Sequence, residues 1–388
     1  MTVGEAAGRR PVVPRAVRIG AVLVTVLVLL FGVPYWTLVA APGWSPAATG
    51  VGGVVFGLAA VVFPALMVLG HLRGSDAAAR AGDTLLGVVW VLFVWSVFGN
   101  VLRLVLALAG VAQSARVGAA VVAAVAVVLL AWGYAEAMRV PRVREVPVTL
   151  PRLGAGLDGT RLVMLTDTHY GPIDRAGWSE KVAAVANRLD ADIVAHVGDI
   201  ADGSVDARRA QVAPLGTIEA GLARVYVTGN HEYFGDAPGW LEHMRALGWE
   251  PLHNRHVVVE RGGDRLVVAG IDDFTARGSG APGHGADLDA ALSGADPSLP
   301  VLLLAHQPKQ IRQAEAAGVD LQISGHTHGG QIWPFHHLVR LDQPLVAGLA
   351  KITDRTWLYT SRGTGFWGPP FRIFAPSEIT VLTLRAAA

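Results

Sequence analysis

Four long apolar stretches in the first third of the chain limit how it can fold. They cover residues 19–41, 50–70, 84–109 and 116–135. Each comes close to, or exceeds, the roughly 20 residues that an α-helix needs to cross a bilayer. The first stretch is too long for a secretory signal peptide and has no clean small-residue cleavage site. The sequence therefore predicts a membrane domain of four transmembrane helices over residues 1–138.

Positive side chains in the loops predict how these helices are oriented. Arginines precede the first stretch, lie between the second and third, and follow the fourth: Arg9, Arg10, Arg15, Arg18, Arg73, Arg80, Arg139, Arg142 and Arg144. The loop at 41–49, between the first and second stretches, carries no charge. Because basic loops stay on the cytoplasmic side, we expect both termini in the cytoplasm of a multi-pass, integral protein of the cell membrane.

Composition agrees with a membrane protein and excludes several kinds of site. The chain of 388 residues is 52% hydrophobic and 16% charged, which is more apolar than an ordinary soluble domain. Its net charge of +1 gives no argument for a nucleic-acid partner. Because cysteine is absent, there is no disulfide, thiolate metal site or cysteine nucleophile. Nothing in the composition bears on oligomeric state.

The chain changes character after the fourth apolar stretch. Residues 139–157 are basic and punctuated by proline, which favours a linker. From residue 158 to 388, short apolar runs alternate with amphipathic stretches, and this alternation predicts an α/β domain. Strands are expected at 161–165, 193–197, 225–228, 266–271, 301–305, 321–324, 357–360 and 379–384, and helices at 178–189, 236–247, 286–293 and 309–317.

Five of the expected strands are followed at once by side chains that bind metals. These sequences are TDTH at 166–169, GDIAD at 198–202, GNHE at 229–232, AHQP at 305–308 and GHTH at 325–328. Sites in α/β domains gather beyond the carboxyl ends of strands, so we expect these loops to meet at one edge. In extended backbone, residues i and i+2 point the same way. Asp167 with His169, and His326 with His328, are therefore expected to offer paired ligands.

Seven side chains are candidate metal ligands: Asp167, His169, Asp199, Asn230, His306, His326 and His328. Carboxylate, imidazole and amide groups without a thiolate favour divalent ions such as Mn, Fe, Zn, Ni or Co. Seven donors are too many for one ion with an open position. They suit two ions about 3.5–4 Å apart that share a carboxylate, as in enzymes that displace groups at phosphorus. Alone, GDIAD also fits a helix N-cap, GNHE fits a turn, and a DxH pair such as Asp167 and His169 arises often by chance. The ordered set predicts a dimetal centre.

The ordered motifs resemble those of the calcineurin-like metallophosphoesterases, in particular a membrane-associated bacterial branch. The ending GHTHGGQ at 325–331, the SRG segment at 361–363 and the strand start at 376–379 add to the likeness. The resemblance implies an α/β/β/α two-sheet sandwich. It also implies two ligand sets that share Asp199: Asp167, His169, Asp199 and His328 for one metal, and Asp199, Asn230, His306 and His326 for the other.

The resemblance implies further roles outside the ligand set. His231 would stabilise the phosphoryl group or protonate the leaving oxygen. Asp202 would orient a ligand by hydrogen bonding. Thr168 and Tyr170 stand where the family usually has apolar residues. Neither would be a ligand, but both could change the approach to the substrate.

Four further places carry polar or aromatic residues of interest. Arg362 lies between glycine-containing turns and could grip a phosphate bidentately, although a structural ion pair is the favoured interpretation. A turn is favoured for the pair at 272–273. A surface or packing role is favoured for the histidines at 336–337. The aromatic run at 366–371 could pack on the core, cover the site or dip into the membrane interface, and packing is favoured.

The leading functional hypothesis is a membrane-anchored dimetal phosphoesterase that hydrolyses a phosphate ester by attack of metal-bound hydroxide. The anchor favours a phosphodiester of a lipid or of another membrane-proximal substrate. One alternative is a membrane-tethered nucleotide or cyclic-nucleotide phosphodiesterase. Another is a non-catalytic metal-binding sensor or scaffold, against which the intact ligand set and His231 argue.

Overall fold

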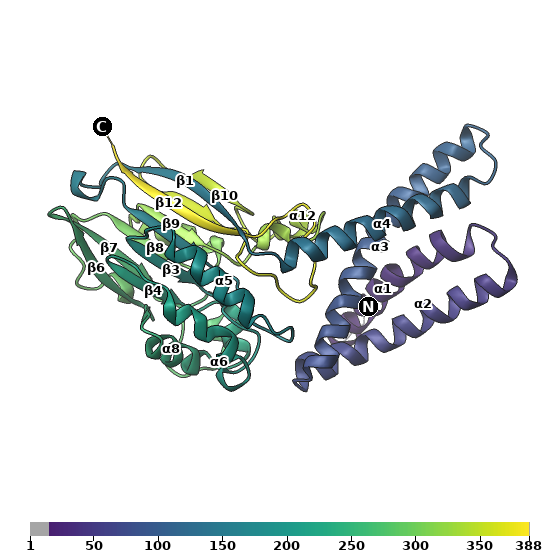
Figure 1. Cartoon of the computed structure of the whole chain (residues 1–388), viewed down its shortest axis with the longest axis horizontal. Coiled ribbons are helices and arrows are strands. Elements are labelled where there is room, and N and C mark those ends of the chain that lie inside the picture. The colour runs from purple at the N-terminus through teal and green to yellow at the C-terminus, as the bar shows by residue number, and fades with distance from the viewer. Residues whose placement is uncertain (1–14, 388) are drawn as a thin grey trace, which may run out of the picture. The chain divides into compact units, whose positions relative to one another are not determined.

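A computed structural model describes residues 15–387, which divide into two compact units (Figure 1). Among the described residues, the helical unit contains 15–65 and 88–128, and the sandwich unit contains 66–87 and 129–387. Arg9 and Arg10, which contribute to the predicted orientation, lie outside the described residues. The boundaries between the two units fall inside long helices.

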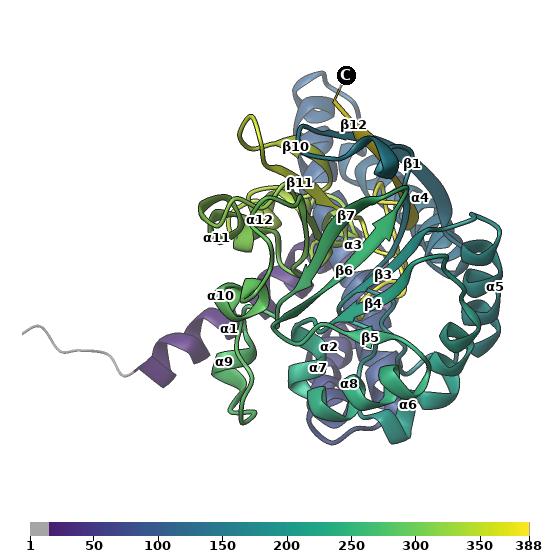
Figure 2. The ribbon, with the colours of Figure 1, turned by 90° about the vertical axis from the view of Figure 1, so that its left-hand side faces the viewer.

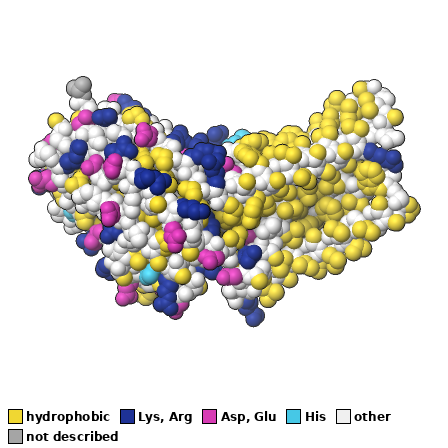
Figure 3. All heavy atoms as spheres, viewed as in Figure 1, with side chains coloured by type: hydrophobic (Ala, Val, Ile, Leu, Met, Phe, Trp, Pro, Cys, Tyr) yellow, Lys and Arg dark blue, Asp and Glu magenta, His cyan; other side chains and the backbone are white. Residues whose placement is uncertain are grey.

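The described residues confirm the four predicted membrane helices. Their bounds are α1 (Arg15–Tyr35) with the π-helical turn η1 (Trp36–Ala40), α2 (Pro46–Met67) with η2 (Val68–Leu72), α3 (Asp76–Leu108) and α4 (Ser114–Met138). Each is long and apolar enough to cross a membrane, and apolar side chains cover them on the face shown in Figure 3. Helix α3 begins before the predicted residue 84, because its first turns carry charged residues that an apolar stretch excludes. Within the helical unit, Asn100 Nδ2 donates to Thr37 Oγ1 at 2.7 Å.

Twelve strands among the described residues form two six-stranded sheets. The first sheet has the order β1-β12-β2-β3-β4-β5 and the second β10-β11-β9-β8-β7-β6. Strands β2 to β5 run parallel to one another, as do β7, β8, β9 and β11. The bounds are β1 (Arg142–Leu150), β2 (Arg161–Leu165), β3 (Ile193–Val197), β4 (Ala223–Val227), β5 (Glu250–Pro251), β6 (Arg255–Arg261), β7 (Asp264–Gly270), β8 (Val301–Leu304), β9 (Leu321–Ser324), β10 (Gly348–Lys351), β11 (Trp357–Thr360) and β12 (Glu378–Ala386).

Side chains on both faces of each sheet are buried, which explains the continuous apolar runs in the sequence. In β2, Leu162 and Met164 lie in the core between the sheets, whereas Val163 and Leu165 lie in the core on the outer face. Figure 2 shows helices along each outer face. They are α5 (Ala176–Asn187), α6 (Val205–Val212) and α8 (Ala237–Ala246) on the first sheet, and α10 (Leu288–Leu292) and α11 (Ile311–Ala316) on the second. The α/β/β/α sandwich is thus as predicted.

The structure differs from the sequence prediction within the expected linker at 139–157. Residues Arg142–Leu150 form β1, which pairs in parallel with the whole of β12. Arginines and Pro147 in this segment indicated a linker, but edge strands tolerate both because one side of their backbone needs no partner. Val148 and Leu150 are buried in the core between the sheets. This segment therefore belongs to the sandwich.

Candidate metal centre

The seven candidate ligands all lie directly after strands, at the carboxyl ends of five neighbouring strands in the two sheets. Asp167 and His169 follow β2, Asp199 follows β3, Asn230 begins α7 (Asn230–Phe234) after β4, His306 follows β8, and His326 and His328 follow β9. Because β2, β3 and β4 are parallel, as are β8 and β9, their ends deliver these side chains to one edge of the sandwich.

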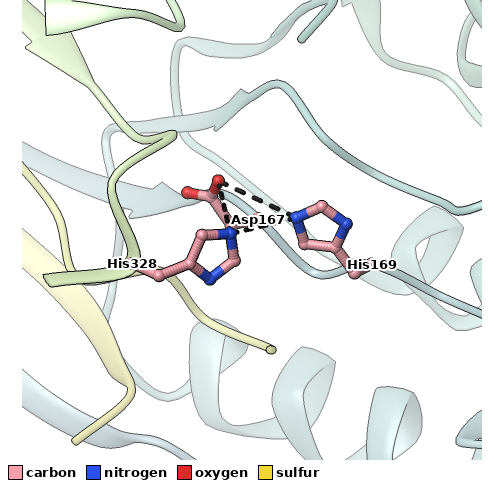
Figure 4. A group of neighbouring side chains, drawn as sticks. All are labelled: Asp167, His169 and His328. Atoms are coloured by element: carbon pink, nitrogen blue, oxygen red, sulfur yellow. Dashed lines mark hydrogen bonds and ion pairs between the residues drawn. The ribbon is translucent and has the colours of Figure 1, made fainter. Parts of the chain in front are cut away.

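Asp167, His169 and His328 form one group whose ligand atoms can reach a single ion (Figure 4). The Nε2 atoms of the two histidines are 3.1 Å apart. Asp167 Oδ1 lies 3.4 Å from Nε2 of His328 and 4.0 Å from Nε2 of His169. All three side chains are buried, so these donors face one another rather than solvent.

Asp199 lies between this group and a second one. Its Oδ2 atom is 3.5 Å from His169 Nε2 and 3.1 Å from His306 Nε2. His326 belongs to the second group with Asp199 and His306, and its Nδ1 atom lies 2.9 Å from Asn230 Oδ1. One carboxylate thus contacts imidazoles of both groups, as a shared ligand would.

A buried nitrogen of this cluster is available to bind a metal ion. His306 Nδ1 donates to Val197 O at 2.7 Å, while its buried Nε2 makes no well-aligned hydrogen bond in the described part of the chain and faces Asp199 Oδ2 at 3.1 Å. Burial alone would lower the pKa of His306, but the carboxylates of Asp199 and Asp167 raise it well above its usual value. These carboxylates therefore favour a positive charge at the ring of His306, and a bound divalent cation would supply that charge. Burial lowers the pKa of His326 to about 3, which leaves a neutral ring able to bind a metal.

Five of the seven ligands adopt left-handed backbone, contrary to the extended backbone assumed from the sequence. The φ angles are 53° for Asp167, 42° for His169, 52° for Asp199, 69° for His326 and 51° for His328. Such conformations are uncommon outside glycine, and each costs on the order of 1–3 kcal/mol. Asp167 and His169 still converge on one group, whereas His326 and His328 point into different groups. Sharp turns rather than pleated strands aim these side chains.

Two glycines allow other chain segments to approach the ligands closely. A Cβ atom at Gly325 would collide with the hydroxyl of Thr166 and the carboxylate of Asp167. One at Gly229 would collide with the carboxylate of Asp199. Because these contacts leave no space for a side chain, glycine at these positions is required by the packing of the ligands.

Asp202 orients two imidazoles at once. Its Oδ1 atom lies 2.9 Å from Nδ1 of His169 and 2.7 Å from Nδ1 of His231. Burial alone would raise the pKa of Asp202, but these imidazoles lower it, so the carboxylate stays ionised. Burial would likewise lower the pKa of His231, but Asp199 and Asp202 raise it to about 9. His231 is thus held by an anion that favours its protonated form.

Glu232 and Arg372 also shape the site, and sequence reasoning missed both. Glu232 accepts hydrogen bonds from the backbone N–H groups of Gly229 at 2.5 Å, Asp199 at 3.0 Å and Ile200 at 2.7 Å. Its position three residues after the helix N-cap Gly229 was a usable signal, because glutamate there satisfies free N–H groups. Arg372 was a lone charge in an aromatic, apolar run.

Arg372 is fully buried and fixes the loop that carries His328. Its guanidinium donates to the carbonyl oxygens of His328 at 3.2 Å, Ala375 at 2.8 Å and Arg362 at 2.8 Å. A further guanidinium nitrogen lies 3.3 Å from His328 Nδ1. Because the charge is compensated largely by carbonyl dipoles, removing this side chain would leave several buried acceptors without donors.

The remaining sequence candidates have other surroundings. Arg362 makes an ion pair with Glu378, with 3.1 Å between Nη1 and Oε2. Asp273 Oδ1 accepts from the N–H of Thr275 at 2.8 Å, which is a turn contact. The rings of His336 and His337 lie 3.9 Å apart and contribute to no metal-binding group among the described residues.

The hydroxyl groups of Thr168 and Tyr170 form contacts inside the protein. Thr168 Oγ1 donates to Ile200 O at 2.9 Å, and Tyr170 OH lies 2.7 Å from Ser179 Oγ. Both side chains are fully buried. Both hydroxyl groups are thus used in hydrogen bonds inside the protein, and any effect of these residues on the approach of a substrate stays a prediction.

Asp202→Asn should weaken metal binding by about 10–100-fold, because an amide holds the ring of His169 less well than a carboxylate does. The dissociation constant for Mn²⁺, measured by titration of the chelator-stripped protein in detergent, checks this. The matched control is Asp206→Asn, whose side chain is 88% exposed and whose affinity should equal that of the wild type. Equal affinities for all three proteins would contradict the orienting role of Asp202.

Comparison with known proteins agrees with this geometry. Residues 160–330 match the family model of the calcineurin-like phosphoesterases. A protein of Danio rerio named "Transmembrane protein with metallophosphoesterase domain" is 39% identical over 266 residues, which cover 67% of this chain and 61% of that protein. Its namesake in Bos taurus is 37% identical over 272 residues, or 68% of this chain and 61% of that protein.

A bacterial relative gives a similar result. An uncharacterised metallophosphoesterase of Helicobacter pylori is 37% identical over 253 residues, which cover 65% of this chain and 66% of that protein. This chain therefore spans about 61% of the length of the vertebrate relatives it matches. The matched motifs are those whose side chains converge at the strand ends. Residues 160–330 are a calcineurin-like phosphoesterase domain.

Proposed function

We propose that this chain is a membrane-anchored dimetal phosphoesterase that hydrolyses a phosphodiester of a lipid or of another membrane-proximal substrate. Asp167, His169, Asp199 and His328 would hold one ion, and Asp199, Asn230, His306 and His326 the other. The donor set suits Mn, Fe, Zn, Ni or Co. When bound, two such ions supply Lewis-acid activation of water and stabilise charge on the phosphoryl oxygens.

His231 is the proton donor of the proposed reaction. Its Nδ1 atom is occupied by Asp202 at 2.7 Å, which leaves Nε2 for an oxygen of the substrate. The contact between Nδ1 and the Asp202 carboxylate raises the pKa of His231 and so favours the protonated ring that a proton donor needs. As the oxygen of water bonds to phosphorus, that water gives up one proton to solvent, the bond from phosphorus to the leaving alcohol breaks, and His231 gives its proton to the leaving oxygen.

The proposal of a membrane-proximal substrate rests on one observation: the candidate metal centre is attached to the end of α4. The N–H of Arg372 donates to Gly133 O, near the end of that helix, at 2.9 Å. The guanidinium of the same residue holds His328. The ring centroids of Trp132 and Phe374 lie 5.4 Å apart. All these residues belong to the sandwich unit, so one arginine joins the last apolar helix to a metal ligand.

A pocket beside His328 supports an amphiphilic substrate. Its volume is about 580 Å³, and its lining includes Gly329, which follows the ligand directly. The lining combines basic and apolar groups, among them His336, Arg340 and Arg362, and Trp333, Leu345 and Phe374. Arg340 is exposed and makes no ion pair within residues 15–387. Guanidinium groups bind phosphate oxygens, and apolar walls bind acyl chains.

Large apolar side chains are exposed around this pocket. Phe335 and Leu338 are 40% and 49% exposed, Leu341 is 83% exposed and Phe374 is 58% exposed. They flank Arg340, on or beside the short helix α12 (His336–Val339) and the loop after β11. Aromatic and aliphatic groups interspersed with arginine are typical of surfaces that lie at the level of lipid headgroups. This surface would let a lipid reach the site.

A matched pair of substrates tests the proposal: phosphatidylglycerol in mixed micelles, and glycerophosphoglycerol, which has the same phosphodiester without acyl chains. We expect kcat/KM to be at least about tenfold higher for the lipid, because apolar contacts add at least ~1.4 kcal/mol. Arg340→Ala should lower the lipid value about tenfold through loss of a charge-assisted contact, whereas Arg312→Ala, an exposed arginine outside the pocket lining, should not. Hydrolysis of cyclic nucleotides alone would contradict a lipid substrate and favour the nucleotide alternative.

The cytoplasmic position of the sandwich unit can be tested cleanly because the chain has no cysteine. We expect a membrane-impermeant maleimide to label Ser45→Cys, in the uncharged loop between α1 and α2, on intact cells. Asp354→Cys, at a fully exposed position of the sandwich unit, should be labelled only after the cells are permeabilised. The reverse pattern would place the catalytic unit outside the cell.

A further inference from the structure

A second cluster of metal-binding side chains lies outside the dimetal centre. It consists of His253, Asp272 and His284, whose ligand atoms all lie within 4.8 Å of one another. The three residues come from separate segments: the loop after β5, the end of β7, and the loop between α9 (Ala276–Ser279) and α10. None of them is among the seven ligands of the dimetal centre. The sequence interpretation of Asp272 as an ordinary turn residue does not explain two histidines beside it.

Both imidazoles present the same ring nitrogen to the one carboxylate. His253 Nδ1 lies 2.6 Å from Asp272 Oδ1, and His284 Nδ1 lies 3.5 Å from Asp272 Oδ2. The ring centroids are 4.5 Å apart, with 36° between the ring planes. A structural histidine–aspartate pair needs only one of these rings. Two nitrogens and a carboxylate oxygen that converge from three segments form one face of a coordination shell.

Burial and charge suit these groups to a cation. The side chain of Asp272 is 1% exposed and that of His284 is 7% exposed, whereas that of His253 is 36% exposed. Two imidazoles beside one buried carboxylate offer an ion neutral nitrogen donors and a negative charge. The exposed edge of His253 gives an ion access from solvent.

We propose that His253, Asp272 and His284 bind a third divalent transition-metal ion, of the zinc class, with water completing its coordination. Two imidazoles and a carboxylate without a thiolate match the donors of zinc sites that keep an open position. The ion would join three loops that also meet through hydrogen bonds. Among these bonds, Asp272 Oδ2 accepts from the N–H of Gly285 at 2.9 Å.

Without an ion, His284 is connected to the helix that carries part of the dimetal centre. Tyr233 OH lies 3.0 Å from His284 Nδ1 and 3.1 Å from Thr228 Oγ1. Tyr233 belongs to α7, which also contains Asn230 and His231. Because His284 would bind the ion through Nδ1, its hydrogen bond with Tyr233 would be exchanged for a metal bond. Binding of the ion would therefore release Tyr233 from His284 and leave its contact with Thr228 Oγ1, 3.1 Å away.

Counting bound zinc tests this proposal independently of catalysis. The full-length protein, purified in detergent with an affinity tag that contains no histidine, would be stripped with a chelator, loaded with Zn²⁺ and desalted before elemental analysis. We expect three zinc ions per chain in the wild type and two in both His253→Ala and His284→Ala. The matched control, His336→Ala, removes a histidine from a stacked pair that contributes to no metal-binding group in the described residues, and should keep three.

A second comparison separates the third site from the dimetal centre. In an Asp199→Asn background, adding His253→Ala should still lower the zinc count by one, because the two sites share no ligand. Two zinc ions in the wild type, with no loss in either histidine variant, would overturn the proposal and leave the dimetal centre intact. The wild-type count needs no variant, so the test stands even if a substitution prevents folding.

Discussion

The carboxylate of Asp199 lies between two groups of ligands, and much of the sandwich serves to bring those groups to it. Parallel strands in both sheets end at the same edge, so donors from β2, β3, β4, β8 and β9 converge there. The backbone at five ligands is left-handed, which is unfavourable in isolation. Buried Glu232 and Arg372 hold these turns through backbone hydrogen bonds. The stability of the core thus maintains a strained set of donors.

The strands of the sandwich unit follow closely after the last membrane helix, α4. Only three residues separate Met138, the end of α4, from Arg142, the start of β1. Strand β1 is then fixed along the whole of β12, and Arg372 joins Gly133 to the loop of His328. A long flexible tether would let such a domain sample soluble substrates freely. These short connections are the basis of our proposal that the substrate lies at the membrane, and the pocket next to Gly329 is lined by both basic and apolar groups.

Local sequence patterns predicted the parts of the structure that depend on local interactions. Apolar runs of four or five residues gave β2, β3 and β9 their bounds, and the polar residues that follow them gave the ligand candidates. The features that these local patterns did not predict depend on residues that are distant in the sequence. Strand β1 exists because β12, more than 200 residues later, pairs with it. Two further features arise from loops that meet only in the folded chain: the contacts of Arg372, and the cluster of His253, Asp272 and His284. Their residues are far apart in the sequence, so no local motif predicts that they meet.

The central claim is that Asp199 joins two ions, and the electron paramagnetic resonance spectrum of the Mn²⁺-loaded protein tests it most directly. Two Mn²⁺ ions about 3.5–4 Å apart and bridged by a carboxylate interact magnetically. The His253→Ala variant keeps a third ion out of the spectrum. We predict the signal of a spin-coupled Mn²⁺ pair in that variant, and its loss in a protein that also carries Asp199→Asn. A spectrum of isolated Mn²⁺ ions alone, at full occupancy, would contradict the account.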